Sequence, residues 1–121
     1  MHVMRIFIAD DSAAIRERLV KLLSSIRGVE VVGVAIDGVE TMLSVRKTKP
    51  DLVILDLQMP TLSGLEILPE IKEMSPSPIV MVLTNFSSHP HRGMCAKLGA
   101  DYFFDKSTEF EKAIKVIENM A

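Results

Sequence analysis

Few residues in this sequence point to a disulfide-bonded, secreted or membrane-spanning protein. Among its 121 residues there is one cysteine, no tryptophan and one tyrosine. Because Cys95 has no partner in the chain, an internal disulfide is excluded, and a reducing compartment is the natural setting. No apolar run reaches the roughly 18 residues of a membrane helix, and the first residues lack the pattern of a signal peptide. We therefore expect a cytoplasmic protein with no membrane partner.

Features that mark nucleic-acid or nucleotide binding are also missing. The formal net charge is -2 at pH 7, whereas binding to nucleic acid usually needs a clearly basic face. The sequence has neither a phosphate-binding loop ending in Gly-Lys-Ser/Thr nor a glycine-rich dinucleotide turn. Its 48% of hydrophobic residues can bury a sizeable core, and its length fits one domain. We expect a single domain over residues 1–121 that does not bind nucleic acid directly.

Short apolar runs alternate with helical patterns along the chain. We predict five strands, at residues 5–9, 30–35, 52–55, 79–83 and 102–104. Continuous apolar runs such as 52–55 are typical of strands that are covered on both faces. After each run, apolar residues recur at helical spacing, which predicts five helices. Five strand–helix units with short connections indicate an α/β fold, in which a parallel sheet has helices on both faces.

Capping residues give two of the expected helix starts. Asp37 has Glu40 three residues later, and Thr108 has Glu111 three residues later. Both pairs have the spacing of a capping box, in which the two residues satisfy each other's backbone donors. The sequence therefore predicts that the second helix begins at Asp37 and the fifth at Thr108.

Acidic, hydroxyl and basic side chains follow the predicted strands where each strand ends. Asp10 and Asp11 follow the first strand and Asp56 the third, while Thr84 follows the fourth and Lys106 the fifth. Because the carboxyl ends of parallel strands meet at one edge of a sheet, we expect these side chains to converge. Each close pair of carboxylates repels by roughly 4 kcal/mol at an effective dielectric near 20, and a hard divalent cation relieves that repulsion. Oxygen ligands with room for water favour Mg²⁺ over zinc.

Other groups at this edge extend the site from metal binding to phosphoryl transfer. The backbone carbonyl of Gln58 is close enough in sequence to Asp56 to supply one more oxygen to the cation. Lys106 and the Thr84 hydroxyl are suited to holding the oxygens of an incoming phosphoryl group. Positioning and neutralising these oxygens is most of what phosphoryl transfer requires from a protein.

Four motifs together carry a resemblance to a known family. They are IADDS at residues 8–12, DLVILDLQMP at 51–60, LT at 83–84 and GADYFFDK at 99–106. No single one is decisive, but their order and separations match along essentially the whole chain. On these motifs the sequence resembles the response-regulator receiver domains of two-component signalling. The resemblance implies a flavodoxin-like, doubly wound, five-stranded parallel sheet with strand order 2-1-3-4-5 and five helices.

The resemblance also implies a metal-dependent phosphoacceptor. Asp56 matches the residue that takes the phosphoryl group, and the implied Mg²⁺ ligands are Asp10, Asp11, Asp56 and the Gln58 carbonyl. The implied partners are a histidine kinase or histidine phosphotransfer protein upstream, and an effector protein or a fused output domain downstream. Such a protein is a signalling switch rather than an enzyme, since it catalyses only its own phosphorylation and dephosphorylation.

The remaining residues implied by the resemblance belong to the switch. Thr84 and Lys106 match the phosphoryl contacts, and Thr84 with Phe103 matches the pair that alters the surface formed by the fourth helix, fifth strand and fifth helix. Phe103 stands where a tyrosine is frequent. Ser107 follows Lys106 where many members have proline, so the sequence does not set the isomer of the Lys106–Ser107 peptide.

Each site residue also has a simpler interpretation. Asp10 and Asp11 are placed to cap the first helix, where carboxylates favour the helix dipole, Thr84 to be a β-branched strand residue, and Lys106 to be a surface lysine. The main rival function is an Asp-dependent phosphatase of small molecules. That chemistry usually needs a carboxylate two residues after the nucleophile, where this chain has Gln58, which cannot act as an acid or base.

His89 and His91 flank a proline with no acidic or cysteine ligand beside them, which favours an exposed helix start over a metal site. The sequence is compatible both with a stand-alone regulator and with the receiver piece of a longer transcription factor.

Overall fold

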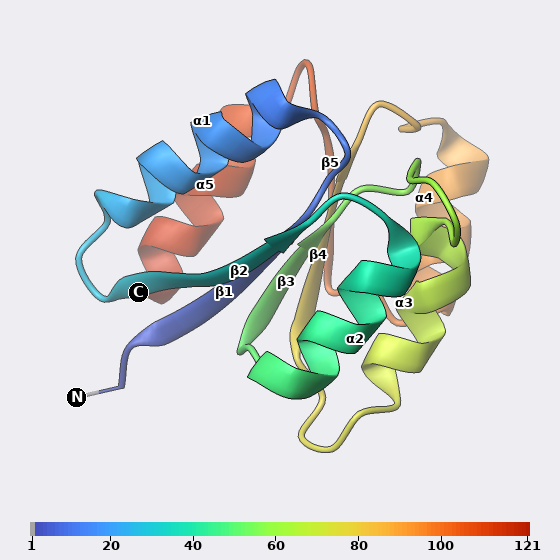
Figure 1. Ribbon diagram of the computed structural model, residues 1–121. Coiled ribbons are helices and arrows are strands. Elements are labelled where there is room, and N and C mark those ends of the chain that lie inside the picture. The colour runs from blue at the N-terminus through green and yellow to red at the C-terminus, as the bar shows by residue number, and fades with distance from the viewer. Residues whose placement is uncertain (1) are drawn as a thin grey trace.

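The computed structural model describes residues 2–121 and contains one five-stranded parallel sheet with helices on both faces (Figure 1). The strands are β1 (Met4–Ala9), β2 (Val29–Ala35), β3 (Leu52–Leu55), β4 (Ile79–Thr84) and β5 (Tyr102–Asp105). Their order across the sheet is 2-1-3-4-5, so the predicted fold is confirmed. Each predicted strand end lies within one residue of the observed one.

The five helices divide between the two faces of the sheet. They are α1 (Ala13–Ser24), α2 (Gly38–Thr48), α3 (Gly64–Lys72), α4 (His89–Lys97) and α5 (Phe110–Met120). Figure 1 shows α1 and α5 on one side, with α2, α3 and α4 on the other. Each side has its own buried apolar cluster, one formed with α1 and α5 and the other with α2, α3 and α4. Cys95 is fully buried in the second cluster.

The register of β1 and β3 brings two acidic residues together. Ala9 is paired with Leu55, the last residue of β3. The chain leaves both strands at the same edge, and the N–H of Asp56 donates to the carbonyl of Ala9 at 2.9 Å. Both strands are almost fully buried, because helices cover each face of the central strands. This buried centre of the sheet holds the first residues of both following loops.

The starts of the helices agree only in part with the prediction. Asp37 caps α2, and its side chain accepts the N–H of Glu40. The expected cap at Thr108 is wrong, because α5 begins at Phe110 and has no side-chain cap. The N–H of Thr108 instead donates to a carboxylate oxygen of Asp105 at 2.9 Å. That bond belongs to the turn after β5, so Thr108 is held outside the helix.

Candidate functional site

Asp10 and Asp56 form the buried part of the site. They are 2% and 4% exposed, and each follows the end of a central strand. The N–H of Ser12 donates to Asp10 Oδ1 at 2.8 Å, and the N–H of Gln58 donates to Asp56 Oδ1 at 3.3 Å. One oxygen of each carboxylate is therefore oriented by the backbone that follows it, and the other oxygen faces Lys106.

Lys106 connects the two buried carboxylates. Its Nζ lies 2.7 Å from Asp10 Oδ2 and 2.9 Å from Asp56 Oδ2, and its side chain is 9% exposed. Burial by itself lowers the pKa of Lys106, but hydrogen bonds to both carboxylates and their charges outweigh burial and raise it. Burial, followed by the charge of Asp56, raises the pKa of Asp10 against the hydrogen bonds from Lys106 and Ser12. The ammonium of Lys106 thus offsets the repulsion between the carboxylates of Asp10 and Asp56, which are almost fully buried.

Thr84 lies at the end of β4, next to this cluster along the sheet edge. Its side chain is fully buried, and its hydroxyl oxygen accepts the N–H of Phe86 at 3.1 Å. Its carbonyl accepts the backbone N–H of Lys106 at 2.9 Å. The backbone of Thr84 therefore helps to fix the position of Lys106, the residue that follows β5.

Asp11 supplies the exposed side of the acidic cluster. One carboxylate oxygen each from Asp10, Asp11 and Asp56 lie within 4.8 Å of one another. Beside them, Asp11 and Gln58 line an open hollow of about 340 Å³ together with Met59 and Pro60. The donors are oxygens, and the hollow has room for water, which together suit a small hard cation. The residues present therefore fit Mg²⁺, with Asp11 and Gln58 on the solvent side.

The simpler roles of the acidic pair are not those seen. Ser12 is the N-cap of α1, and its hydroxyl oxygen accepts the N–H of Ile15, so neither Asp10 nor Asp11 caps that helix. His89 begins α4, and His91 pairs with the hydroxyl of Ser88 in its first turn. Both histidines therefore have the expected helix-start position.

A second polar cluster joins β5 to α4 and was not found from the sequence. The guanidinium of Arg92 lies 4.8 Å above the ring of Phe103 and pairs with Glu109. Glu109 also accepts the N–H of Asp105 at 2.9 Å. Phe103 itself is half-buried against the cluster under α2, α3 and α4. Arg92 thus links α4 to the segment that carries Phe103. Arg92, Phe103 and Glu109 are too far apart in sequence to form a local motif.

The carboxylate of Asp105, beside this cluster, has a pKa below its usual value. Hydrogen bonds from the Ser87 hydroxyl and then from the N–H groups of Thr108 and Ser107 lower the pKa of Asp105 from 3.8 to about 2. A carboxylate whose pKa is lower in the folded state adds stability above its unfolded pKa and loses it as pH falls through its folded pKa. The stabilising effect of Asp105 is therefore nearly complete at about pH 5, falls most steeply between about pH 4 and pH 2, and is gone only at about pH 1.

We expect Asp105→Asn to lower the free energy of unfolding near neutral pH by an amount that shrinks steadily between about pH 4 and pH 2. The amide keeps the shape of the side chain but carries no charge for the three donors. Urea unfolding of wild type and variant across this range measures the difference. Glu118→Gln, at an exposed carboxylate of α5, is the control and should change the free energy of unfolding by less than about 0.5 kcal/mol. A deficit that stays constant down to pH 2 would contradict the assignment.

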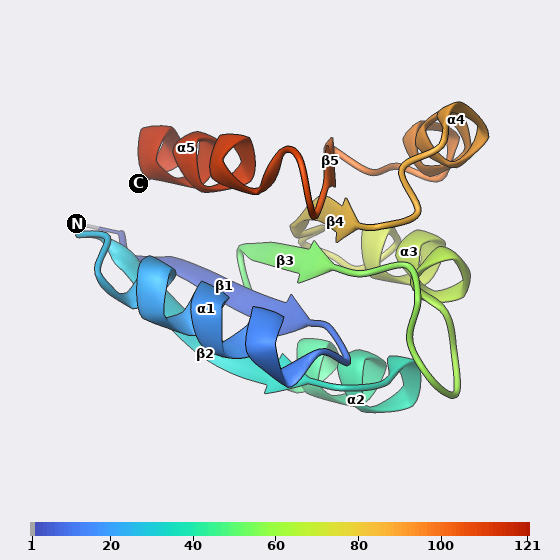
Figure 2. The ribbon, with the colours of Figure 1, turned by 90° about the horizontal axis from the view of Figure 1, so that it is seen from above.

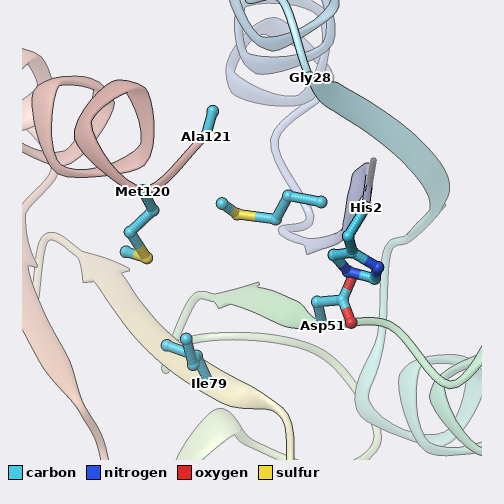
Figure 3. Close-up of a pocket in the computed structure, with 7 residues that line it drawn as sticks. His2, Gly28, Asp51, Ile79, Met120 and Ala121 are labelled. Atoms are coloured by element: carbon cyan, nitrogen blue, oxygen red, sulfur yellow. The ribbon is translucent and has the colours of Figure 1, made fainter.

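The opposite edge of the sheet has a larger hollow with different chemistry. It has a volume of about 470 Å³ and lies where β1, β3 and β4 begin, with a mainly apolar lining that includes Ile79 and Met120. Figure 3 shows the ring of His2 against the carboxylate of Asp51, and these two groups are 2.9 Å apart. Asp51 also accepts the N–H of Arg5. Its polar side chains are thus paired with each other, and the acidic cluster remains the candidate site.

A flavodoxin-like sheet with an acidic, lysine-bridged cluster at the carboxyl ends of its strands defines a class of cation-binding phosphoacceptor domains. The family model "Response regulator receiver domain" matches residues 6–118. The chain belongs to this family, as the motifs predicted. It is a receiver domain of two-component signalling, and a phosphoacceptor role follows from the family.

Two curated relatives match this chain over part of their own length. The chain is 35% identical over 112 residues to an uncharacterized transcriptional regulatory protein, YhcZ, of Bacillus subtilis, covering 93% of this chain and 52% of the relative. It is 38% identical over 106 residues to protein-glutamate methylesterase/protein-glutamine glutaminase 1 of Methanospirillum hungatei, covering 86% and 31%. The chain thus spans about half or less of these two curated relatives.

A solved structure agrees with the fold. The response regulator domain of Thermotoga maritima CheB superimposes with a TM-score of 0.86 at 28% identity, covering 98% of this chain and 93% of that one.

The family gives further properties in general form. Receiver domains generally bind Mg²⁺ through acidic residues, and they interact with histidine kinases or phosphotransfer proteins and with output domains. They are signalling switches, although some relatives are methylesterases by name. Within residues 2–121, no helix is long and apolar enough to cross a membrane.

Proposed function

We propose that Asp56 accepts a phosphoryl group from a phosphohistidine of a kinase or phosphotransfer protein. The single observation that carries this assignment is the contact of Lys106 Nζ with both Asp56 and Asp10, at 2.9 and 2.7 Å. Asp56 is nearly buried, and the N–H of Gln58 orients one of its carboxylate oxygens. The ammonium of Lys106 lies beside the other oxygen. Among the described residues Asp10 shares these properties, and the match of residues 51–60 to the family's motif is what favours Asp56 over Asp10 as the acceptor.

In the proposed reaction, a carboxylate oxygen of Asp56 attacks phosphorus, and the bond from phosphorus to the imidazole nitrogen of the donor breaks. The electron pair of that bond stays on the imidazole. Lys106 and the Thr84 hydroxyl then hold oxygens of the transferred group, since charge-assisted hydrogen bonds are about twice as strong as neutral ones. Bound Mg²⁺, held by Asp10, Asp11, Asp56 and the carbonyl of Gln58, would neutralise charge that develops on the phosphoryl oxygens.

The proposed output is a change in the surface formed by α4, β5 and α5. Moving the Thr84 hydroxyl toward a phosphoryl group would leave space beside β5, and Phe103 is the half-buried ring positioned to use it. Arg92 lies over this ring and is tied to Glu109, so a movement of Phe103 would alter the contacts of α4. The phosphoryl group would then shift a population between two states of this surface.

A receiver that signals to another domain or protein fits this chain better than a small-molecule phosphatase. Gln58 occupies the position two residues after Asp56, and its N–H orients the Asp56 carboxylate. An amide in that position cannot donate a proton to a leaving group.

We propose that a separate effector or a fused output domain reads the switch. A buried lone cysteine is in keeping with the cytoplasm, where we place the protein.

We expect acetyl phosphate with Mg²⁺ to raise the intact mass of wild-type protein by one phosphoryl group, and a chelator to prevent this. In Asp11→Asn, the Mg²⁺ concentration needed for half-maximal labelling should rise about tenfold, because a charged ligand is lost from the solvent side. Mass spectrometry over a magnesium series measures both effects. Glu118→Gln serves as the control and should behave as wild type. Labelling that does not depend on the Mg²⁺ concentration would refute the metal-assisted mechanism. A magnesium dependence of Asp11→Asn that equals that of wild type would show that Asp11 is not a ligand.

A further inference from the structure

The loop between β3 and α3 caps the start of helix α2. The first N–H groups of a helix have no partner within it and need one from elsewhere. The N–H of Gly38 donates to the carbonyl of Pro60 at 3.0 Å, and the N–H of Val39 donates to the Thr61 hydroxyl oxygen at 3.1 Å. Two donors of α2 are thus satisfied by a loop 22 residues further along the chain. Figure 2 shows this loop, in green, reaching to the start of α2.

Asp37 and Thr61 close this contact through their side chains. The Thr61 hydroxyl donates to Asp37 Oδ1 at 3.2 Å, and the same carboxylate oxygen accepts the N–H of Glu40 at 2.8 Å. Thr61 has a φ of 67°, a left-handed conformation that is rare for a β-branched residue. A residue held in such a conformation needs surroundings that fix it, and the hydroxyl with its two partners supplies them.

Close backbone packing fastens the same loop at two places. A Cβ added at Gly38 would lie 2.0 Å from the carbonyl oxygen of Leu62, and one added at Gly64 would lie 2.2 Å from that of Asp56. The N–H of Gly64 also donates to the carbonyl of Leu57 at 2.9 Å. The loop is therefore anchored to the end of β3 on one side and to the start of α2 on the other.

Gln58 lies between these two anchors. Its N–H donates to Asp56, and it lines the hollow beside Asp11. If its carbonyl is a metal ligand, as in the function proposed above, then the anchors decide where that oxygen lies. Groups that hold a metal ligand in place without touching the metal commonly alter metal affinity by about 10- to 100-fold when removed.

We propose that Asp37 and Thr61 are positioning residues for the metal site: their hydrogen bond ties the β3–α3 loop to α2 and thereby places the Gln58 carbonyl for Mg²⁺. The inference rests on the proposed function, because it assigns a purpose to the loop that carries one of its ligands. It adds two residues that touch neither the metal nor the phosphoryl group. It also couples the capping of α2 to metal binding, since the same Thr61 hydroxyl serves both.

The test compares Thr61→Val with Thr61→Ser in protein without a phosphoryl donor. Valine keeps the branched shape and loses the hydroxyl, whereas serine keeps the hydroxyl. Mg²⁺ titrations followed by NMR shifts of residues 56–64 should give a dissociation constant about tenfold higher for Thr61→Val and within about twofold of wild type for Thr61→Ser. Hydrogen exchange of the Val39 amide should quicken in the valine variant alone. Thr61→Gly removes the hydroxyl and relaxes the backbone at φ 67°, so it gives the same comparison if the valine variant does not fold.

The outcomes separate this inference from the function beneath it. If wild type binds Mg²⁺ and is labelled on Asp56, but the valine and glycine variants bind the metal as tightly as wild type, the positioning role is wrong and the function stands. If wild type neither binds Mg²⁺ nor is labelled, the proposed function fails as well. A merely structural role would lower the melting temperature of Thr61→Val and leave the dissociation constant unchanged, which also overturns the proposal.

Discussion

Asp56→Asn should lose essentially all labelling by acetyl phosphate, a fall of at least about 100-fold in the amount of phosphorylated protein. The amide has no anionic oxygen to attack phosphorus, yet it has the size of the carboxylate. We expect the variant to remain folded, because its loss of charge also removes the repulsion between Asp56 and Asp10 in the absence of metal. Intact-mass measurement after incubation with the donor and Mg²⁺ gives the result directly.

The matched control for this experiment lies on the same strand. Asp51 immediately precedes β3 and Asp56 immediately follows it, so the two aspartates lie at opposite edges of the sheet. Asp51 pairs with His2 beside the other hollow. Asp51→Asn should therefore be labelled as fully as wild type. A mass increase that persists in Asp56→Asn would show that another residue is the acceptor.

The sheet and the gathering of charged residues at its edge follow from local sequence patterns. A continuous apolar run such as 52–55 is typical of a strand that is covered on both faces. A helix between successive strands returns the chain to the other end of the sheet, so the strands run parallel. Once the strands are parallel, residues that directly follow them must share an edge. For this reason Asp10, Asp56 and Lys106 were found from the sequence and are seen in contact.

The features that the sequence did not predict depend on a competing local bond in one case and on contacts between distant segments in the others. Thr108 has the spacing of a capping residue, but the carboxylate of Asp105 binds its N–H in the turn before α5. No local pattern pairs Arg92 with Glu109, and their contact appears only when α4 packs beside β5. No local sequence pattern marks Thr61, because its hydroxyl completes the cap of α2, which lies 22 residues earlier in the chain.

One capping box in the sequence, at the start of α3, is not among the predicted helix starts. Ser63 accepts the N–H of Glu66, and the Glu66 side chain accepts the N–H of Ser63. Ser63 and Glu66 have the same three-residue spacing as the capping pairs of the second and fifth helices. The start of α3 could therefore be predicted from the local sequence. The structure thus distinguishes a missed signal from features that local sequence does not encode.

Lys106→Met should lower the free energy of unfolding by about 3 kcal/mol near neutral pH and in the absence of divalent metal, as is typical when one partner of a buried ion pair is removed. Methionine keeps the length of the stem, so the loss would come mainly from leaving Asp10 and Asp56, both at most 5% exposed, without their cation. Lys112→Met is the control, since that side chain is 71% exposed and its Nζ lies 3.6 Å from Glu109, and exposed pairs contribute about 0–1 kcal/mol.

Two conditions should restore stability to Lys106→Met, and each follows from the charge left behind. Burial raises the pKa of Asp10 even beside the lysine, and removing the ammonium can only raise it further. A carboxyl whose folded pKa lies above its unfolded value binds protons preferentially in the folded state, so the deficit should shrink as pH falls from neutrality toward the unfolded value. Mg²⁺ should also reduce the deficit, because binding to the folded state alone stabilises it by mass action. Urea unfolding with and without Mg²⁺ at two pH values measures both. A deficit no larger than that of Lys112→Met would mean that the lysine bridge contributes nothing to the fold, and one that neither acid nor magnesium reduces would place its cause in lost packing instead of uncompensated charge.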